Sequence, residues 1–149
     1  MILNNKEYSK LITKAVRLLN QNLTTLEILE EFNIFENSFL VPEDFHILFF
    51  LFPQKMKKII NGCKPSYLPN FINVNGCDTR KEWCNLHDFC YWISWPRKAS
   101  DLIFINGMNR DLKGFKNKTH NYSFYIAVRT FGQTAFSEEN KTIIDFLEL

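Results

Sequence analysis

The most regular stretch of the sequence is Tyr122-Ser-Phe-Tyr-Ile-Ala-Val-Arg-Thr130. Side chains of an extended strand point alternately to its two faces, so every second residue shares a face. One face then carries Tyr122, Phe124, Ile126 and Val128, and the other carries Ser123, Tyr125, Ala127 and Arg129. Aromatic and β-branched residues with this period of two are typical of a strand that packs one face on the core. The segment therefore predicts a β-strand, and our expectation for the fold starts from it.

Two further segments predict strands for the same sheet. Phe45–Phe52 is a continuous apolar run that ends before a proline, which indicates a strand buried on both faces, with a short helix as the alternative. Asp101–Ile105 precedes Asn106-Gly107, a dipeptide that favours a tight hairpin turn. Tyr91–Trp95 also has the composition of extended chain before a proline.

Helices are predicted on both sides of these strands. Tyr8–Leu19 carries apolar residues at helical spacing, and Thr24 and Glu27 form a capping-box pattern that begins a second helix. Thr79–Phe89 has a weaker helical pattern, and Ser137, followed by two glutamates, predicts a closing helix. This order of elements predicts an α+β fold in which an antiparallel sheet is sandwiched by helices.

Length and composition predict a single domain over residues 1–149. The hydrophobic share of 46% is ordinary for a globular chain. With 18 basic and 16 acidic residues, the net charge of +2 does not indicate nucleic-acid or membrane binding. The N-terminus lacks an apolar signal-peptide region, and no apolar run approaches the roughly 20 residues of a bilayer span. We therefore expect a cytoplasmic protein with free cysteines.

Metal-ligand chemistry is suggested by one cluster, Cys84-x-x-His87-x-x-Cys90, with Cys77 upstream of it. The paired C-x-x-C or H-x-x-x-H units of zinc sites are missing, so buried thiols beside a histidine are the preferred interpretation. Signatures of nucleophilic catalysis, phosphate-binding loops and metalloproteases are missing as well. We expect no metal, no cofactor and no catalytic residue, and hence a protein that is not an enzyme. A thiol enzyme that acts through Cys84 or Cys90 is the catalytic alternative.

The most distinctive segment contains Trp83, Asp88, Tyr91, Trp92 and Trp95. Aromatic rings and one carboxylate can line a small-molecule cavity, in which the rings pack against the ligand and the carboxylate orients it. The alternative is an aromatic core that only packs. The basic residues between positions 110 and 121 are interpreted as a solvated loop, in preference to a phosphate-binding one.

The segment from Tyr122 to Leu149 resembles the end of GAF/PAS-like sensor domains, especially those that head LuxR-type transcription regulators. The matching features are the hydrophobic strand, a short turn, and then an acidic-capped helix that begins near Ser137. The resemblance implies an α-β-α sandwich that senses a ligand or dimerises, with a final helix that continues toward a DNA-binding domain. The W-x-x-x-Y and D-P motifs of the family's acyl-homoserine-lactone receptors are missing.

Two hypotheses of different classes follow. The first is a ligand-sensing or dimerisation domain of a LuxR-type regulator, a homodimer that binds a small molecule between its sheet and its helices. The ligand-binding residues would be Trp83, Asp88, Tyr91, Trp92, Trp95, Phe124 and Tyr125. This domain alone would bind neither nucleic acid nor a membrane. The alternative is a stand-alone protein-interaction module (an effector, immunity protein or inhibitor) without catalytic activity.

Overall fold

A computed structural model describes residues 3–34, 39–63 and 77–149 of the chain. The regular elements of the described part are helical. They are α1 (Asn5–Asn20), α2 (Thr25–Glu31), the 3-10 helix η1 (Pro42–Asp44), α3 (Phe45–Leu51), α4 (Pro53–Met56), α5 (Cys77–Trp92), α6 (Arg97–Asp111), α7 (Phe115–Phe131), the 3-10 helix η2 (Gly132–Thr134) and α8 (Ile143–Leu147). The strand-like geometry of the described residues is limited to one antiparallel bridge between Phe39 and Thr142.

The predicted α+β fold is therefore wrong, and so is the resemblance to a GAF/PAS-like sensor domain of a LuxR-type regulator. An α-β-α sandwich needs an antiparallel sheet, whereas the described ranges are all-α. The segment Gly62–Gly76 is rich in Asn, Pro and Gly, which predicts a loop with extended pieces, but its residues 64–76 lie outside the described residues. No helix within the described ranges is both long enough and apolar enough to cross a bilayer.

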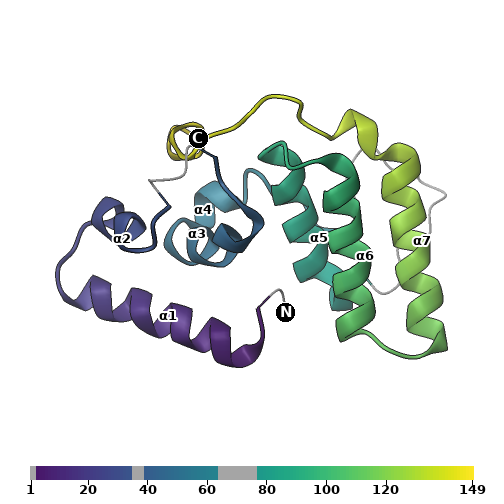
Figure 1. Cartoon of the computed structure of the whole chain (residues 1–149), viewed down its shortest axis with the longest axis horizontal. Helices are drawn as coiled ribbons and strands as arrows, with labels where there is room; N and C mark the ends of the chain where they lie inside the picture. Colours follow the sequence, from purple (N-terminus) through teal and green to yellow (C-terminus); the bar gives the residue numbers. More distant parts are fainter. Residues whose placement is uncertain (1–2, 35–38, 64–76) are drawn as a thin grey trace.

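The helices fall into two groups (Figure 1). Helices α5, α6 and α7 run side by side, with α6 packed between the other two. Helices α1 to α4 form the second group, in which α1 packs on both α2 and α3. After α7 the chain passes back across the molecule in an extended path, so that α8 ends beside the second group. The candidate site described below lies where the two groups meet.

Helix α7 replaces the strand predicted over residues 122–130. Its buried residues, Asn121, Phe124, Ala127 and Val128, recur at spacings of three and four, which place them on one helical face. Tyr122 and Ile126 should have been buried with Phe124 if the strand had formed, but they are 59% and 43% exposed. Packing against α6 therefore overrides the preference of aromatic and β-branched residues for strands.

The strands predicted over residues 45–52 and 101–105 are helices as well. Helix α3 buries the four consecutive residues 45 to 48, so its unbroken apolar run reflects a helix enclosed on most sides. In α6, Gly107 lies inside the helix and not in a hairpin turn. A Cβ atom at position 107 would overlap the ring of Trp83, so this glycine allows α5 and α6 to approach closely. The segment 91–95, predicted to be extended, begins inside α5.

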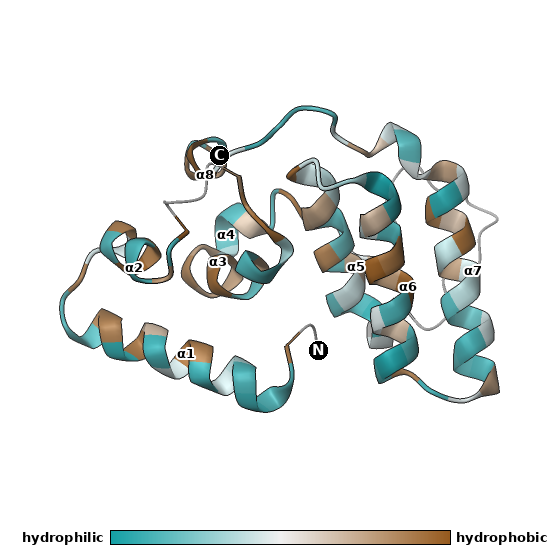
Figure 2. Cartoon of the chain, in the orientation of Figure 1, coloured by the Kyte–Doolittle hydropathy of each residue, from teal (hydrophilic) through white to brown (hydrophobic). Residues whose placement is uncertain are grey.

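The helices predicted from amphipathic spacing and capping signals near the N-terminus are confirmed. Helix α1 covers the predicted segment 8–19, and its apolar residues gather on the edge that faces α3 (Figure 2). Helix α2 begins after the predicted N-cap. There the backbone N–H of Glu27 donates to the Thr24 hydroxyl, and the backbone N–H of Thr24 donates to the Glu27 carboxylate. Helix α5 contains the predicted segment 79–89 and extends it at both ends.

The predicted closing helix forms as α8, but its predicted start at Ser137 is wrong. The helix begins later, and the side chain of Thr142 caps it. Its residue Phe146 is fully buried and packs edge-on against Phe52 and Trp92. The C-terminal helix therefore contributes to the contact between the two groups of helices.

Covalent and polar links also connect distant parts of the chain. A disulfide joins Cys63, which follows α4, to Cys84 of α5. The expectation of free thiols is therefore wrong for these two cysteines. Within α4, the Lys55 ammonium donates to the backbone oxygens of Leu147 and Leu149 at 2.6 and 3.0 Å. These contacts hold the second group of helices against α5 and α8.

Candidate functional site

The predicted ligand-binding residues of α5 contact different neighbours. The ring of Trp83 is buried against Gly107 of α6, and its indole N–H donates to the Asp111 carboxylate at 2.8 Å. Asp88 faces the chain after α4, where its carboxylate accepts a hydrogen bond from the backbone N–H of Asn61 at 2.9 Å. One of these side chains therefore packs on α6, while the other holds a loop.

The side chains of Tyr91 and Trp92 also contact different helices. The Tyr91 hydroxyl donates to Asp101 of α6 at 2.6 Å. The ring of Trp92 lies edge-on to Phe146 of α8, with 6.2 Å between the ring centroids. Consecutive residues of a helix point about 100° apart, and here the two side chains contact different helices, α6 and α8.

The other three predicted ligand-binding residues, Trp95, Phe124 and Tyr125, have neighbours different from those of the first four. Trp95 follows α5 and packs, partly buried, against the hydrophobic core. Phe124 of α7 is buried beneath the guanidinium of Arg80, 5.4 Å from the centroid of its ring, and Tyr125 is half-buried on the same helix. The structure thus does not gather the seven residues around one cavity. Their contacts match the aromatic-core interpretation better than the ligand-pocket interpretation.

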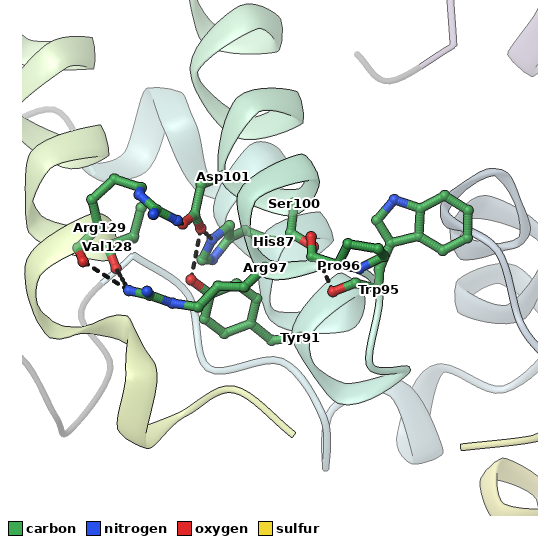
Figure 3. Close-up of polar contacts among 9 residues, drawn as sticks. All are labelled: His87, Tyr91, Trp95, Pro96, Arg97, Ser100, Asp101, Val128 and Arg129. Carbon is green, nitrogen blue, oxygen red and sulfur yellow. Dashed lines mark hydrogen bonds and ion pairs between the residues drawn. The ribbon is translucent and has the colours of Figure 1, made fainter. Parts of the chain in front are cut away.

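A buried carboxylate joins α5, α6 and α7 (Figure 3). Asp101 of α6 has no exposed surface. One of its oxygens lies 2.6 Å from both His87 Nε2 and the Tyr91 hydroxyl, and the other lies 2.7 Å from Nη1 of Arg129. Nearby, the Arg97 guanidinium donates to two backbone oxygens at the end of α7 at 2.9 and 2.8 Å. Each of the three long helices therefore contributes to one polar network.

The protonation states of this network are consistent with one another. Burial alone would raise the pKa of Asp101, but the hydrogen bonds from His87, Tyr91 and Arg129 lower it, so the carboxylate is ionised at neutral pH. Burial lowers the pKa of His87 in spite of the neighbouring carboxylate, so the imidazole is neutral. An ionised carboxylate only accepts, so His87 Nε2 carries the hydrogen. Because no group titrates near pH 7, the network suits a structural role better than acid–base catalysis.

The cysteine and histidine cluster of the sequence does not form a common centre. Cys84 is bonded to Cys63, and His87 is bonded to Asp101. Cys90 is fully buried, and burial raises the pKa of its thiol far above neutrality, which leaves the thiolate unpopulated. Among the described residues, no three His, Cys, Asp or Glu side chains lie close enough to share a metal ion. A nucleophilic role for Cys84 or Cys90 has no support in this geometry.

A pocket of about 560 Å³ lies between α1, α3 and α5. Its lining consists of Tyr8 from α1, Phe45, His46 and Phe49 from α3, and Thr79, Lys81, Glu82 and Asn85 from α5. One wall is therefore aromatic and the opposite wall is polar. Small-molecule sites combine these two features in volumes of roughly 300–1,000 Å³.

His46 is the unusual residue of this pocket. Its side chain is buried, and its ring stands edge-on to the rings of Tyr8 and Phe45, 5.1 and 5.5 Å between centroids. Its Nε2 atom lies 3.7 Å from Oε1 of Glu82 but has no hydrogen-bond partner in the described part of the chain. Burial lowers the pKa of His46, and the Glu82 charge opposes this only in part, so the imidazole is neutral. A buried polar atom without a partner costs about 1–3 kcal/mol. In the described residues, Ser94 Oγ and Arg97 Nε are in the same condition, and of these three atoms the one of His46 belongs to the lining of this pocket.

A second hollow, of about 390 Å³, runs along α1. It is lined by Lys6, Ser9, Lys10, Thr13, Lys14 and Arg17. All of these residues come from one helix, and none is an aromatic or a buried polar group. A solvated basic face accounts for this arrangement, so the pocket beside His46 is the better candidate site.

Neither His46 nor Glu82 was predicted as a site residue from the sequence. The available signal was a histidine inside the apolar run 45–52, because a polar residue in a buried segment needs a partner. That run was interpreted as a strand, so neither the face of His46 nor its neighbour on α5 could be assigned. Comparison with known proteins adds no assignment: neither a family model, nor a curated protein sequence, nor a solved structure matches the chain.

Proposed function

We propose that this chain is a non-catalytic binding protein that holds a small molecule in the pocket between α1, α3 and α5. The observation that carries the proposal is the buried Nε2 atom of His46, which lacks a hydrogen-bond partner in the described residues at the wall of a 560 Å³ pocket. A hydrogen-bonding group of the ligand would satisfy this atom. The rings of Tyr8, Phe45 and Phe49 would pack against the apolar body of the ligand.

The absence of catalysis is part of the proposal. A general acid or base works best with a pKa near the operating pH, whereas the pKa of His46 is lowered by burial. The carboxylate of Glu82 lies 3.7 Å from His46 Nε2, and burial keeps this imidazole neutral. Homodimerisation and the protein-interaction module stay predictions from the sequence.

The compartment of the protein is also part of the proposal. From the sequence we expected the cytoplasm, where thiols are kept reduced. The Cys63–Cys84 disulfide is typical of an oxidising compartment instead. We therefore propose that the protein works where this disulfide persists. Mass spectrometry of peptides from the alkylated native protein, digested without reductant, tests this, and free thiols at both positions would contradict it.

A ligand titration with a blocked variant tests the binding function. The probes are 2-phenylethylamine, 2-phenylethanol and 3-phenylpropionate, which share an aromatic body and differ in the polar group. In Lys81→Trp a bulky ring would close the rim of the pocket, because Lys81 is exposed and lines it. Lys98→Trp is the matched control, an exposed lysine of α6 outside this pocket.

We expect saturable binding of at least one probe, measured by NMR chemical-shift changes of the intact protein. Lys81→Trp should weaken this binding at least tenfold, and Lys98→Trp should leave it unchanged. Binding that neither variant affects, or no binding of any of the three probes, would contradict the proposal.

A further inference from the structure

Helix α7, the outermost of the three long helices (Figure 1), carries a row of exposed apolar side chains. Phe115 is 89% exposed, Tyr122 is 59% exposed and Ile126 is 43% exposed. At 100° per residue these three positions lie within about 40° of one another, opposite the buried Phe124 and Val128. This outer stripe runs for about 17 Å along the helix. Exposed apolar side chains that gather on one face mark an interaction site.

Lysines border the outer stripe near the start of α7. Around the helix axis, Lys118 lies about 60° to one side of Phe115 and Lys116 about 100° to the other, while Lys113 precedes the helix. All three lysines are exposed, and none forms an ion pair within the described ranges. Residues 112–137 contain neither Asp nor Glu. The face is therefore cationic around an apolar centre.

This local charge is hidden in the composition of the chain. From the sequence we expected no membrane binding, because 18 basic and 16 acidic residues nearly cancel. The sum combines the lysines near the start of α7 with acidic residues on other elements, such as those of α2. A contact surface is attracted by the charges that it presents and not by the net charge, because salt screens charges about 10 Å away or more.

The hydroxyl groups of this face have hydrogen-bond partners within the helix. Thr119 donates to the backbone oxygen of Phe115, and Ser123 donates to the backbone oxygen of Thr119, both at 3.0 Å. Removing a polar group from water costs much less free energy when the group keeps a hydrogen bond. The face can therefore leave water without stranding these two donors.

From these observations we propose that the outer face of α7 binds the surface of an anionic lipid bilayer. Phe115, Tyr122 and Ile126 would enter the boundary between head groups and acyl chains, and the lysines would contact the anionic head groups. A protein partner would need a groove shaped to this convex row, whereas lipids adapt to it. A nucleic acid would need cations at the centre of the face, where the apolar side chains lie.

Helix α1 carries a basic face of a different kind. Lys6, Lys10 and Arg17 line the hollow along this helix, and no aromatic side chain lines it with them. Cations alone hold a protein on an anionic bilayer less firmly than cations together with inserted apolar side chains. Lysines of α1 therefore serve as the control for those of α7.

Sedimentation of the full chain with sucrose-loaded vesicles tests the proposal. The probes are vesicles of phosphatidylcholine alone and vesicles of phosphatidylcholine and phosphatidylserine in equal parts. We expect the partition coefficient to be at least tenfold higher for the anionic vesicles. It should fall as NaCl is added, because salt screens the attraction between the lysines and the lipids.

Variants of α7 separate the two contributions. Phe115→Gln should lower the partition coefficient at least fivefold, because it removes the most exposed apolar side chain of the outer stripe. The double variant Lys116→Gln/Lys118→Gln should lower it at least tenfold. The three side chains are exposed, so both variants should fold, and circular dichroism checks this.

Two control variants alter exposed residues of other helices. Leu26→Gln changes an apolar side chain of α2 that is 50% exposed. Lys6→Gln/Lys10→Gln removes from α1 the same charge that the double variant removes from α7. Both controls should keep the partition coefficient within twofold of the parent value.

Four results would overturn the proposal. No binding to either kind of vesicle would leave the outer stripe to a protein partner, and equal binding to both kinds would exclude a role for lipid charge. Binding that the α7 lysine variant lowers but Phe115→Gln does not would show attraction without insertion. Binding that depends on the lysines of α1 and not on those of α7 would place the contact on α1. The pocket beside His46 is a separate site, so each of these results leaves the proposed function in place.

Discussion

Replacing Asp101 with alanine tests whether its carboxylate holds α5, α6 and α7 together. The substitution removes the acceptor of three hydrogen-bond donors. The donors of His87 and Tyr91 are buried, whereas the Arg129 side chain is 34% exposed. Each stranded buried donor costs about 1–3 kcal/mol, whereas the arginine can turn to water. We expect the free energy of unfolding to fall by about 4 kcal/mol, in line with the loss of one partner from a buried charged network.

Urea unfolding, followed by tryptophan fluorescence and by far-ultraviolet circular dichroism, measures this change. Arg129→Gln is the matched comparison, because it removes the outer donor and leaves the two buried donors bonded to Asp101. We expect this variant to lose only about 1–2 kcal/mol. A loss below about 1 kcal/mol in Asp101→Ala, which is usual for ordinary substitutions, would refute the reasoning. Equal losses in the two variants would refute it as well.

Three further predictions concern stability. Reduction of the Cys63–Cys84 disulfide, which spans a sequence separation of 21 residues, should lower the free energy of unfolding by about 3 kcal/mol in urea titrations with and without dithiothreitol. Gly107→Ala should cost about 1–3 kcal/mol in the same assay, because the added Cβ overlaps the ring of Trp83. Burial raises the pKa of Asp88 from 3.8 to about 7, although hydrogen bonds from backbone N–H groups lower it. Because the folded state holds this proton more tightly than the unfolded state, Asp88 contributes fully to stability below pH 3.8, and this contribution is lost as the pH rises toward 7. Asp88→Asn should therefore flatten the fall in Tm between pH 4 and pH 8.

Each of these predictions has a result that contradicts it. Cys90→Ala removes a buried thiol without changing the disulfide, so it should keep the response to dithiothreitol, and a response lost in this variant would point to Cys90. An unchanged free energy of unfolding in Gly107→Ala would show that α5 and α6 do not pack as closely as described. A pH profile of Asp88→Asn that matches the parent would assign the titration to another group, and Asp44, whose pKa burial raises to about 6, would be tested next.

The helices near the N-terminus could be predicted because their signals are local. The capping box of Thr24 and Glu27 satisfies backbone N–H groups within one turn of the chain, whatever the rest of the protein does. The amphipathic spacing of residues 8–19 likewise needs only one apolar surface to pack on. Sequence and structure agree at these two segments, whereas the start signal predicted at Ser137 is not used and the side chain of Thr142 caps α8 instead.

The predicted sheet failed for a physical reason that its three segments share. Residues 45–52, 101–105 and 122–130 are rich in aromatic and β-branched side chains, which fit either a strand or a buried helix. Spacing at intervals of three and four was present in residues 121 to 128, but the alternation of neighbouring residues masked it. Gly107 was interpreted as part of a turn, since its contact with Trp83 on another helix is not visible in the sequence.

The sequence by itself determined that residues 8–19 are helical, that α2 begins after its cap at Thr24, and that known catalytic motifs are missing from the chain. Only the tertiary structure decided that the fold is helical over the described residues, since burial and not local preference selects the period of an apolar segment. It also decided the candidate site, because His46 and Glu82 lie on α3 and α5 and meet only when the two groups of helices pack. A pocket between elements distant in the sequence depends on how those elements pack, and no local signal encodes that contact.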